Sequence, residues 1–204
     1  MNLAVIGSGG REHAICYKLK QSSKINRLFC IPGNAGTKKI AENINEDISN
    51  FKALYKIIKK QNIDLVVIGP EQPLVDGLVD YLTERKIKVF GPSRFASQLE
   101  GSKGFMKNLC KKHNIPTANF GIFSNFLEAS SFIRKNGAPI VVKANGLASG
   151  KGVTVCNSIE EALKKSKETS RKVPCLLKMI DLNGVLSNQA LRRTKPLFQF
   201  SLNK

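Results

Sequence analysis

Four short runs of strand-forming residues, each followed at once by a loop that contains glycine or proline, constrain the fold most strongly. The runs cover residues 3–6, 27–31, 63–68 and 87–90. Helical patterns separate them, most clearly within residues 49–61, where apolar side chains recur at helical spacing. Strands that alternate with helices are typical of a doubly wound α/β domain with a parallel sheet, which we expect over residues 1–92. Its loops should meet at the carboxyl ends of the strands, where such domains bind ligands.

The first of these loops has the pattern of an anion site. It reads Gly-Ser-Gly-Gly-Arg-Glu-His over residues 7–13 and precedes a helix expected over residues 14–19. The unpaired N–H groups and the dipole at a helix start favour anions. A dinucleotide fingerprint is excluded because Glu12 stands where its third glycine belongs, so a smaller phosphate ligand fits better. Arg11 and His13 are candidate contacts; alternatively, His13 only caps or packs the helix start.

A second glycine-rich loop joins two β-branched runs, at residues 140–142 and 153–155. It holds three glycines and has a lysine near each end: Gly146, Gly150, Gly152, Lys143 and Lys151. Glycines let backbone N–H groups approach anionic oxygens, and lysines supply charge, so the loop is suited to a polyphosphate. It is not a Walker loop, because no Ser or Thr follows Gly-Lys and a strand follows the loop. The alternative is a plain hairpin with solvated lysines.

The chain between and around these loops predicts a smaller second unit. Two short helices interrupted at Gly101 form a helical linker over residues 93–117, in which Lys103 begins the second helix. A cation there favours an anionic partner, although a solvated lysine is the alternative. Residues 118–168 then predict a β-α-β-β-α unit, which needs a second wall to enclose a ligand.

Composition excludes several classes of protein. Hydrophobic and charged contents of 42% and 24% are ordinary for a globular chain, and no apolar run reaches the length of a membrane helix. The five cysteines are widely spaced without a C-x-x-C pair, which predicts reduced thiols, no zinc site and a cytoplasmic location. The net charge of +18 reflects lysines scattered on helix faces and a basic end, without interleaved aromatic residues, so no nucleic-acid partner is expected.

Five motifs together resemble the glycinamide ribonucleotide synthetase family, the phosphoribosylamine–glycine ligases of the ATP-grasp superfamily. They lie at residues 7–13, 32–36, 69–74, 99–103 and 143–152, in the family's order and spacing. The resemblance covers about residues 1–168. Two positions depart from the family pattern: Asn145 replaces the usual Asp and Ser149 replaces the usual Ala.

The resemblance implies an ATP-dependent carbon–nitrogen ligase of purine biosynthesis that joins glycine to 5-phosphoribosylamine through a glycyl phosphate. Mg²⁺ or Mn²⁺ would assist, and the complete enzyme would be a monomer that has small molecules as its only partners. The first domain, called the pre-ATP-grasp domain, would bind phosphoribosylamine through Gly9, Gly10, Arg11, Glu12, His13, Gly33, Asn34, Ala35, Gly36, Gly69, Pro70 and Glu71. The small α+β ATP-grasp subdomain would bind ATP through Lys103, Lys143, Gly146, Leu147, Ala148, Ser149, Gly150, Lys151 and Gly152. Lys143 and Lys151 would be catalytic by stabilising charge on the moving γ-phosphoryl group.

Residues 169–204 match nothing in the family, so we expect an unmatched, disordered tail. The family's adenine hinge and its Glu and Asn metal ligands are missing from it, which predicts that this chain has no metal site and is inactive alone. The tail would be an out-of-frame reading or the end of a truncated product; a genuine divergent tail is the alternative. The competing function is a non-catalytic phosphosugar-binding module.

Overall fold

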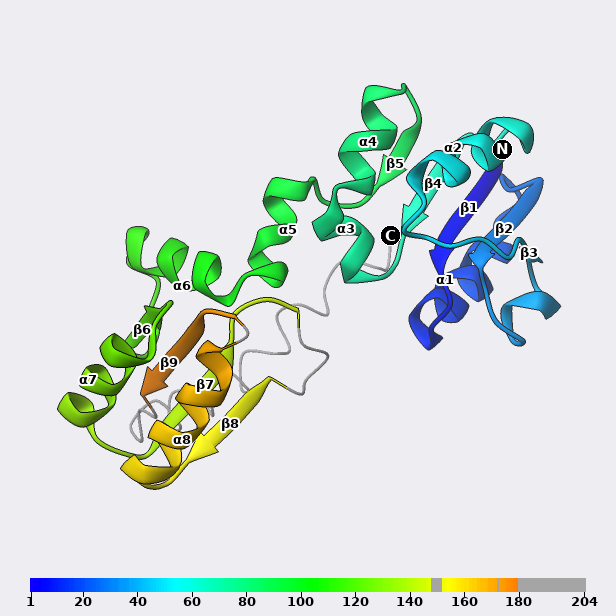
Figure 1. The fold of residues 1–204 in the computed structure, drawn as a ribbon. Coiled ribbons are helices and arrows are strands. Elements are labelled where there is room, and N and C mark those ends of the chain that lie inside the picture. The colour runs from blue at the N-terminus through cyan, green and yellow to red at the C-terminus, as the bar shows by residue number, and fades with distance from the viewer. Residues whose placement is uncertain (148–151, 172, 180–204) are drawn as a thin grey trace. The chain divides into compact units, whose positions relative to one another are not determined.

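The computed structural model describes residues 1–147, 152–171 and 173–179, which form two compact units (Figure 1). The first unit is Met1–Gly101, and the second begins at Ser102. The predicted helical linker over residues 93–117 is therefore divided between them. Its first helix packs on the first unit, where Gly101 lies against Val75, while the start of its second helix is hydrogen-bonded to Asn145 of the second unit.

A five-stranded parallel sheet with strand order β3-β2-β1-β4-β5 forms the centre of the first unit. Its strands are β1 (Asn2–Gly7), β2 (Arg27–Pro32), β3 (Glu42–Asn43), β4 (Leu65–Ile68) and β5 (Lys88–Phe90). The helices are α1 (Gly10–Lys20), η1 (Thr37–Lys39), α2 (Phe51–Lys60), α3 (Glu71–Asp76), α4 (Leu78–Glu84) and α5 (Arg94–Gly101). The doubly wound α/β prediction is thus confirmed.

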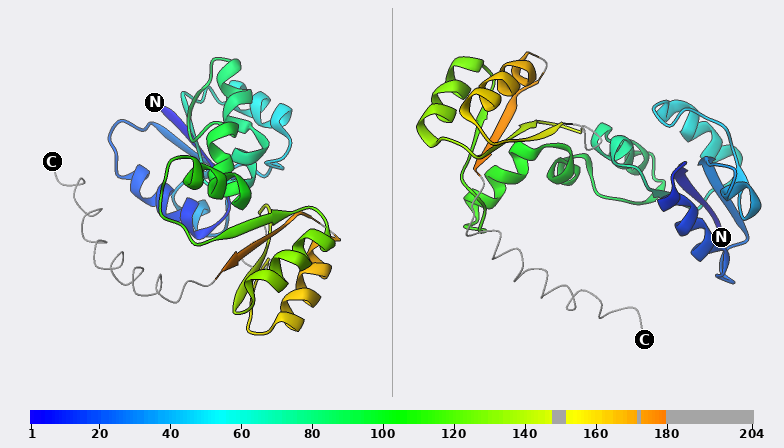
Figure 2. Two further views of the ribbon diagram at one scale, coloured as in Figure 1. Left: turned by 90° about the vertical axis from the view of Figure 1, so that its left-hand side faces the viewer. Right: turned by 90° about the horizontal axis from the view of Figure 1, so that it is seen from below.

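Helices cover both faces of this sheet (Figure 2). On one face, Leu54 of α2 and Leu82 of α4 pack against buried strand residues such as Ile6 and Phe29. On the other face, Cys16 of α1 packs in a separate cluster. Because both faces are buried, the strands are nearly continuous apolar runs, as the sequence predicted.

Two helices, α3 and α4, follow each other directly between β4 and β5. Gly77 separates them with φ of +95°, a left-handed conformation that an L side chain rarely adopts. The N–H of Gly77 donates to the carbonyls of Pro73 and Leu74, which ends α3.

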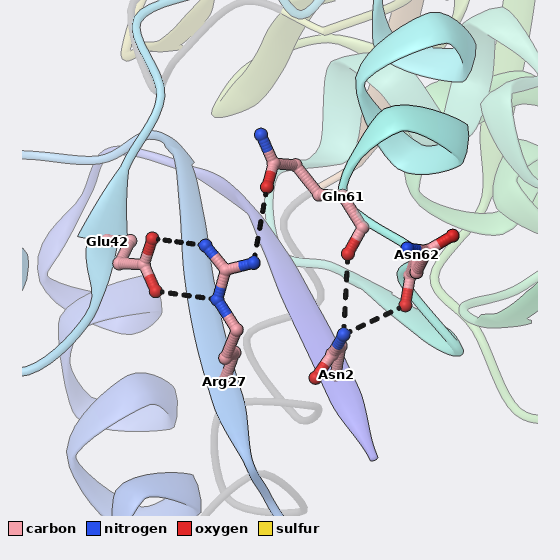
Figure 3. Close-up of polar contacts among 5 residues, drawn as sticks. All are labelled: Asn2, Arg27, Glu42, Gln61 and Asn62. Carbon is pink, nitrogen blue, oxygen red and sulfur yellow. Dashed lines mark hydrogen bonds and ion pairs between the residues drawn. The ribbon is translucent and has the colours of Figure 1, made fainter.

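A polar network ties the amino ends of the strands together (Figure 3). Arg27 donates to the Glu42 carboxylate from Nε and Nη2 at 3.0 and 2.7 Å, and from Nη1 to Gln61 Oε1 at 3.4 Å. The Asn2 side-chain amide donates to the carbonyls of Gln61 and Asn62 at 3.3 and 3.1 Å. The network joins β1, β2, β3 and the turn after α2, at the edge of the sheet that does not bear the glycine loops.

The second unit is built on an antiparallel sheet with strand order β6-β9-β7-β8. Its elements are α6 (Lys103–Lys112), β6 (Phe120–Phe123), α7 (Phe126–Asn136), β7 (Ile140–Ala144), β8 (Val153–Cys156), α8 (Ile159–Ser170) and β9 (Cys175–Met179). Helices α7 and α8 pack on one face, where Ile133 and Ala162 meet Val142 and Leu177. On the opposite face, α6 approaches β6, with Gly104 against Ile122. The predicted α+β subdomain is confirmed.

Strand β9 corrects the prediction of a disordered tail from residue 169. Residues 169 and 170 complete α8, and Cys175–Met179 form a central strand whose Cys175, Leu176 and Leu177 are buried. The prediction was wrong here because this short apolar run sits among basic residues, while its burial depends on pairing with β6 and β7 far back in the chain. None of the helices in the described parts of the chain is long and apolar enough to cross a membrane.

Candidate functional site

Three loops of the first unit meet at the carboxyl ends of β1, β2 and β4, as predicted. The Gly33 N–H donates to the Gly7 carbonyl at 3.1 Å, and the Asn34 side-chain amide donates to the Ser8 carbonyl at 2.8 Å. The Gly69 N–H donates to the Ile6 carbonyl at 3.1 Å. The loops thus form one continuous surface, on which Gly9, Gly10 and Ala35 are exposed.

The loop after β2 is held rigidly by its own side chains. Asn34 Oδ1 accepts from the N–H groups of Gly36 and Thr37 at 2.8 and 2.9 Å. Thr37 is fully buried and donates from Oγ1 to Asn43 Oδ1 at 2.9 Å. The His13 ring of α1 lies directly beside Gly36, so a larger residue there would collide with it. His13 thus packs against the second of these loops from the start of α1.

Arg11 joins the first loop to the third. Its Nη1 donates to the Gly69 carbonyl at 2.6 Å, and its Nη2 pairs with Glu71 Oε1 at 2.7 Å. The hydrogen bond and charge of Glu71 raise the pKa of Arg11, while Arg11 lowers the pKa of Glu71. The side chain of Arg11 is still 57% exposed, so the cation remains available at the surface.

Glu12 is directed into the protein. The residue is only 4% exposed, and its Oε2 accepts from the Gly9 N–H at 2.6 Å. Its side chain lies against Gly7 and Gly69, where a Cβ would overlap it. Glu12 therefore joins the loops from beneath, and this buried placement does not match its predicted role as a contact for a sugar phosphate. Pro70, the remaining predicted residue, caps α3.

The second candidate site lies where β7 ends and α6 begins. Lys103 Nζ donates to the Gly146 carbonyl at 2.6 Å, which places the end of its side chain beside the start of the glycine-rich loop. The Gly104 N–H donates to Asn145 Oδ1 at 3.0 Å. At the other end of the loop, the Gly152 carbonyl accepts from the Ala144 N–H at 2.8 Å. Two sequence segments about 40 residues apart thus meet here.

Four lysines gather around this position, two of which the sequence did not identify. Strand register places Lys143 and Lys178 on the sheet face opposite α7 and α8. Lys107 of α6 is 5% exposed, contacts Thr117 Oγ1, and lies 5.6 Å from the centroid of the Phe120 ring.

Burial and like charges disfavour the protonated form of two of these lysines. Burial lowers the pKa of Lys143, and the ammonium groups of Lys178 and Lys103 lower it further. Burial likewise lowers the pKa of Lys107, with the ammonium groups of Lys178 and Lys143 adding to the effect. An anion bound here would relieve the repulsion, because opposite charge favours the protonated amines.

Part of the predicted nucleotide site falls outside the described residues: Ala148, Ser149, Gly150 and Lys151. Leu147, just before them, is 38% exposed. Among the residues that the structure does describe, no three His, Cys, Asp or Glu side chains are close enough to hold a metal ion.

Two models of protein families match this chain, one over each of its two units. The model of "Phosphoribosylglycinamide synthetase, N domain" matches residues 1–100, and that of "Phosphoribosylglycinamide synthetase, ATP-grasp (A) domain" matches residues 101–173. A phosphoribosylamine–glycine ligase from Brucella melitensis is 52% identical over 163 residues, covering 80% of this chain and 38% of that relative. One from Clostridium acetobutylicum is 45% identical over 169 residues, covering 83% and 40%.

Solved structures agree with these matches. The phosphoribosylamine–glycine ligase of Thermotoga maritima has a TM-score of 0.71 at 33% identity, over 88% of this chain and 44% of that one. N5-carboxyaminoimidazole synthetase of Staphylococcus aureus, complexed with ADP, shares the fold with a TM-score of 0.69 at 20% identity, over 88% and 47%. The chain spans between 38% and 47% of the length of these proteins. Because the two family models together match residues 1–173, the chain belongs to the phosphoribosylglycinamide synthetase family.

Proposed function

We propose that this chain provides the phosphoribosylamine site and the nucleotide-phosphate site of an ATP-dependent ligase that joins glycine to 5-phosphoribosylamine. The lysine cluster, in which Lys103 Nζ contacts the Gly146 carbonyl, is the observation on which the proposal chiefly rests. It lies in the unit that matches the ATP-grasp domain, and it combines Lys103 and Lys143 with a glycine-rich loop.

The chemistry requires positive charge at this position. The glycine carboxylate attacks the γ-phosphorus of ATP, ADP leaves, and glycyl phosphate forms. The amine of phosphoribosylamine then attacks the acyl carbon, and phosphate leaves. Ammonium groups beside the transferring phosphoryl group neutralise charge on its oxygens without forming a covalent bond. One contact at about 4 Å contributes about 4 kcal/mol at an effective dielectric of about 20, before desolvation. Mg²⁺ would add charge neutralisation in the complete enzyme.

The loops of the first unit support the assignment of a sugar phosphate. Gly10 and Arg11 lie at the amino terminus of α1, where backbone N–H groups and the helix dipole favour an anion. Arg11 adds an exposed cation held beside them by Glu71. Gly33 to Gly36 provide the neighbouring wall of the surface.

Turnover is assigned to the complete ligase, because this chain spans 38% of the Brucella relative. We predict no turnover by the 204-residue chain alone. A cytoplasmic location, a monomeric complete enzyme and partners limited to small molecules remain predictions.

Calorimetric titration of the whole chain with ADP and with ribose 5-phosphate tests the proposal. Both ligands should bind, ADP through its phosphates alone, and neither should compete with the other. Failure of ADP to bind would contradict the assignment of the second unit, and failure of ribose 5-phosphate would contradict that of the first.

The second candidate function, a non-catalytic phosphosugar-binding module, is favoured by one observation. The first unit has its own buried clusters on both faces of its sheet, so its loops are supported without the second unit. This function predicts binding of ribose 5-phosphate and no binding of ADP in the same titration.

A further inference from the structure

The side chain of Asn145 links the end of β7 to the start of α6. Its Oδ1 accepts from the Gly104 N–H at 3.0 Å and from Ser102 Oγ at 3.3 Å. The backbone N–H of Asn145 donates to the Pro174 carbonyl at 3.0 Å, which anchors the residue beside β9. One residue of the glycine-rich loop is thus fixed to two other segments of the second unit.

This contact completes the cap of α6. Ser102 is the N-cap, and its Oγ accepts from the Phe105 N–H at 3.1 Å. The first N–H groups of a helix have no partner inside the helix, so an outside acceptor must satisfy them. Asn145 supplies that acceptor for Gly104, which is buried.

Two lysines of the proposed phosphate site lie close in sequence to the residues that make these contacts. Lys103 precedes Gly104, and its Nζ donates to the carbonyl of Gly146, the residue after Asn145. Lys143 lies two residues before Asn145 on β7. The charge of Lys103 lowers the pKa of Lys143, so the two ammonium groups repel each other, and a connection between α6 and β7 helps to keep both in place. The Lys103 ammonium group has three donors, so two can still reach a phosphate.

We propose that Asn145 is a positioning residue, which sets the spacing of the Lys103 and Lys143 ammonium groups that bind nucleotide phosphates. The inference rests on the proposed function of the second unit. It assigns to Asn145 no contact with the nucleotide itself. Aspartate at this position would accept the same two hydrogen bonds, so it should preserve the spacing, whereas alanine would lose it.

Titration of the 204-residue chain with inorganic tripolyphosphate, followed by calorimetry, tests the inference. We expect Asn145→Ala to weaken binding at least tenfold and Asn145→Asp to bind within about threefold of the unchanged chain. The matched control is Asn125→Ala, because Asn125 caps α7 through the same kind of bond, to the Glu128 N–H at 2.9 Å, away from the lysines. This control should lower thermal stability to a similar extent and change tripolyphosphate affinity less than twofold.

Three results would overturn the inference: unchanged affinity in Asn145→Ala, equal loss in Asn125→Ala, or no recovery in Asn145→Asp. Were Asn145→Ala not to fold, Asn145→Ser, whose hydroxyl is too short to bridge both partners, should fold and show the same loss. Its full affinity would equally refute the inference. Absence of tripolyphosphate binding by the unchanged chain would instead refute the phosphate site itself.

Discussion

Replacement of the buried Glu12 should destabilise the first unit far more than replacement of the exposed Glu71 in the same surface. A hydrogen bond to a charged group contributes about 1.5–3 kcal/mol, and Glu12→Ala removes one such bond, leaving the Gly9 N–H without its acceptor. It also empties the space between Gly7 and Gly69. We therefore expect a loss of about 3 kcal/mol in the free energy of unfolding. Glu12→Gln keeps the shape and one acceptor, so its cost should be about 1 kcal/mol.

Urea denaturation followed by circular dichroism would measure these changes, with thermal melting as a second readout. For a unit of this size, about 3 kcal/mol corresponds to a lowering of Tm by roughly 12–24 °C. Glu71→Ala should cost at most about 1 kcal/mol, because its pair with Arg11 is exposed. Equal losses in Glu12→Ala and Glu71→Ala would refute the structural role of the Glu12 carboxylate.

Three further predictions concern the charged groups of the two sites. Burial and neighbouring cations lower the pKa values of Lys107 and Lys143, so between these lowered values and the ordinary lysine value of about 10.4 the folded state binds fewer protons than the unfolded state. The free energy of unfolding of the second unit should therefore rise with pH through that window. Urea denaturation at several pH values would detect the rise, and a flat profile would contradict it. Lys143→Ala should weaken ADP binding at least tenfold in calorimetry and leave the affinity for ribose 5-phosphate within twofold. Equal loss of both affinities would refute the assignment of Lys143 to the nucleotide site. Arg11→Ala should weaken ribose 5-phosphate binding at least tenfold and leave the affinity for ADP within twofold. Unchanged affinity for ribose 5-phosphate would mean that Arg11 only joins the first loop to Gly69.

The sequence predicted the parallel sheet of the first unit and the edge at which its loops meet. Both follow from short-range signals: apolar runs of strand length and the glycines or prolines that end them. Helix bounds were less accurate: the helix expected over residues 14–19 is α1, which begins at Gly10. The break between α3 and α4 depends on a single left-handed residue, Gly77, in an otherwise helical pattern.

The resemblance places Glu12 among the sugar-phosphate contacts, whereas its carboxylate is buried, and no sequence pattern assigned a role to Lys107 or Lys178. The spacing of Gly9 and Glu12 is that of a capping box without a polar cap residue, and this signal could have placed the carboxylate inside. By contrast, Lys107 and Lys178 reach Lys143 only through helix packing and strand register. Such long-range geometry leaves no local pattern in the chain.

The most direct test of two separate phosphate sites is an NMR titration of the backbone amides of the whole chain, first with ribose 5-phosphate and then with ADP. Ribose 5-phosphate should shift the amides of Gly9, Gly10 and Gly36, whereas ADP should shift those of Gly104 and Gly146. Shifts confined to one unit for both ligands, or none for either, would contradict the assignment of two sites.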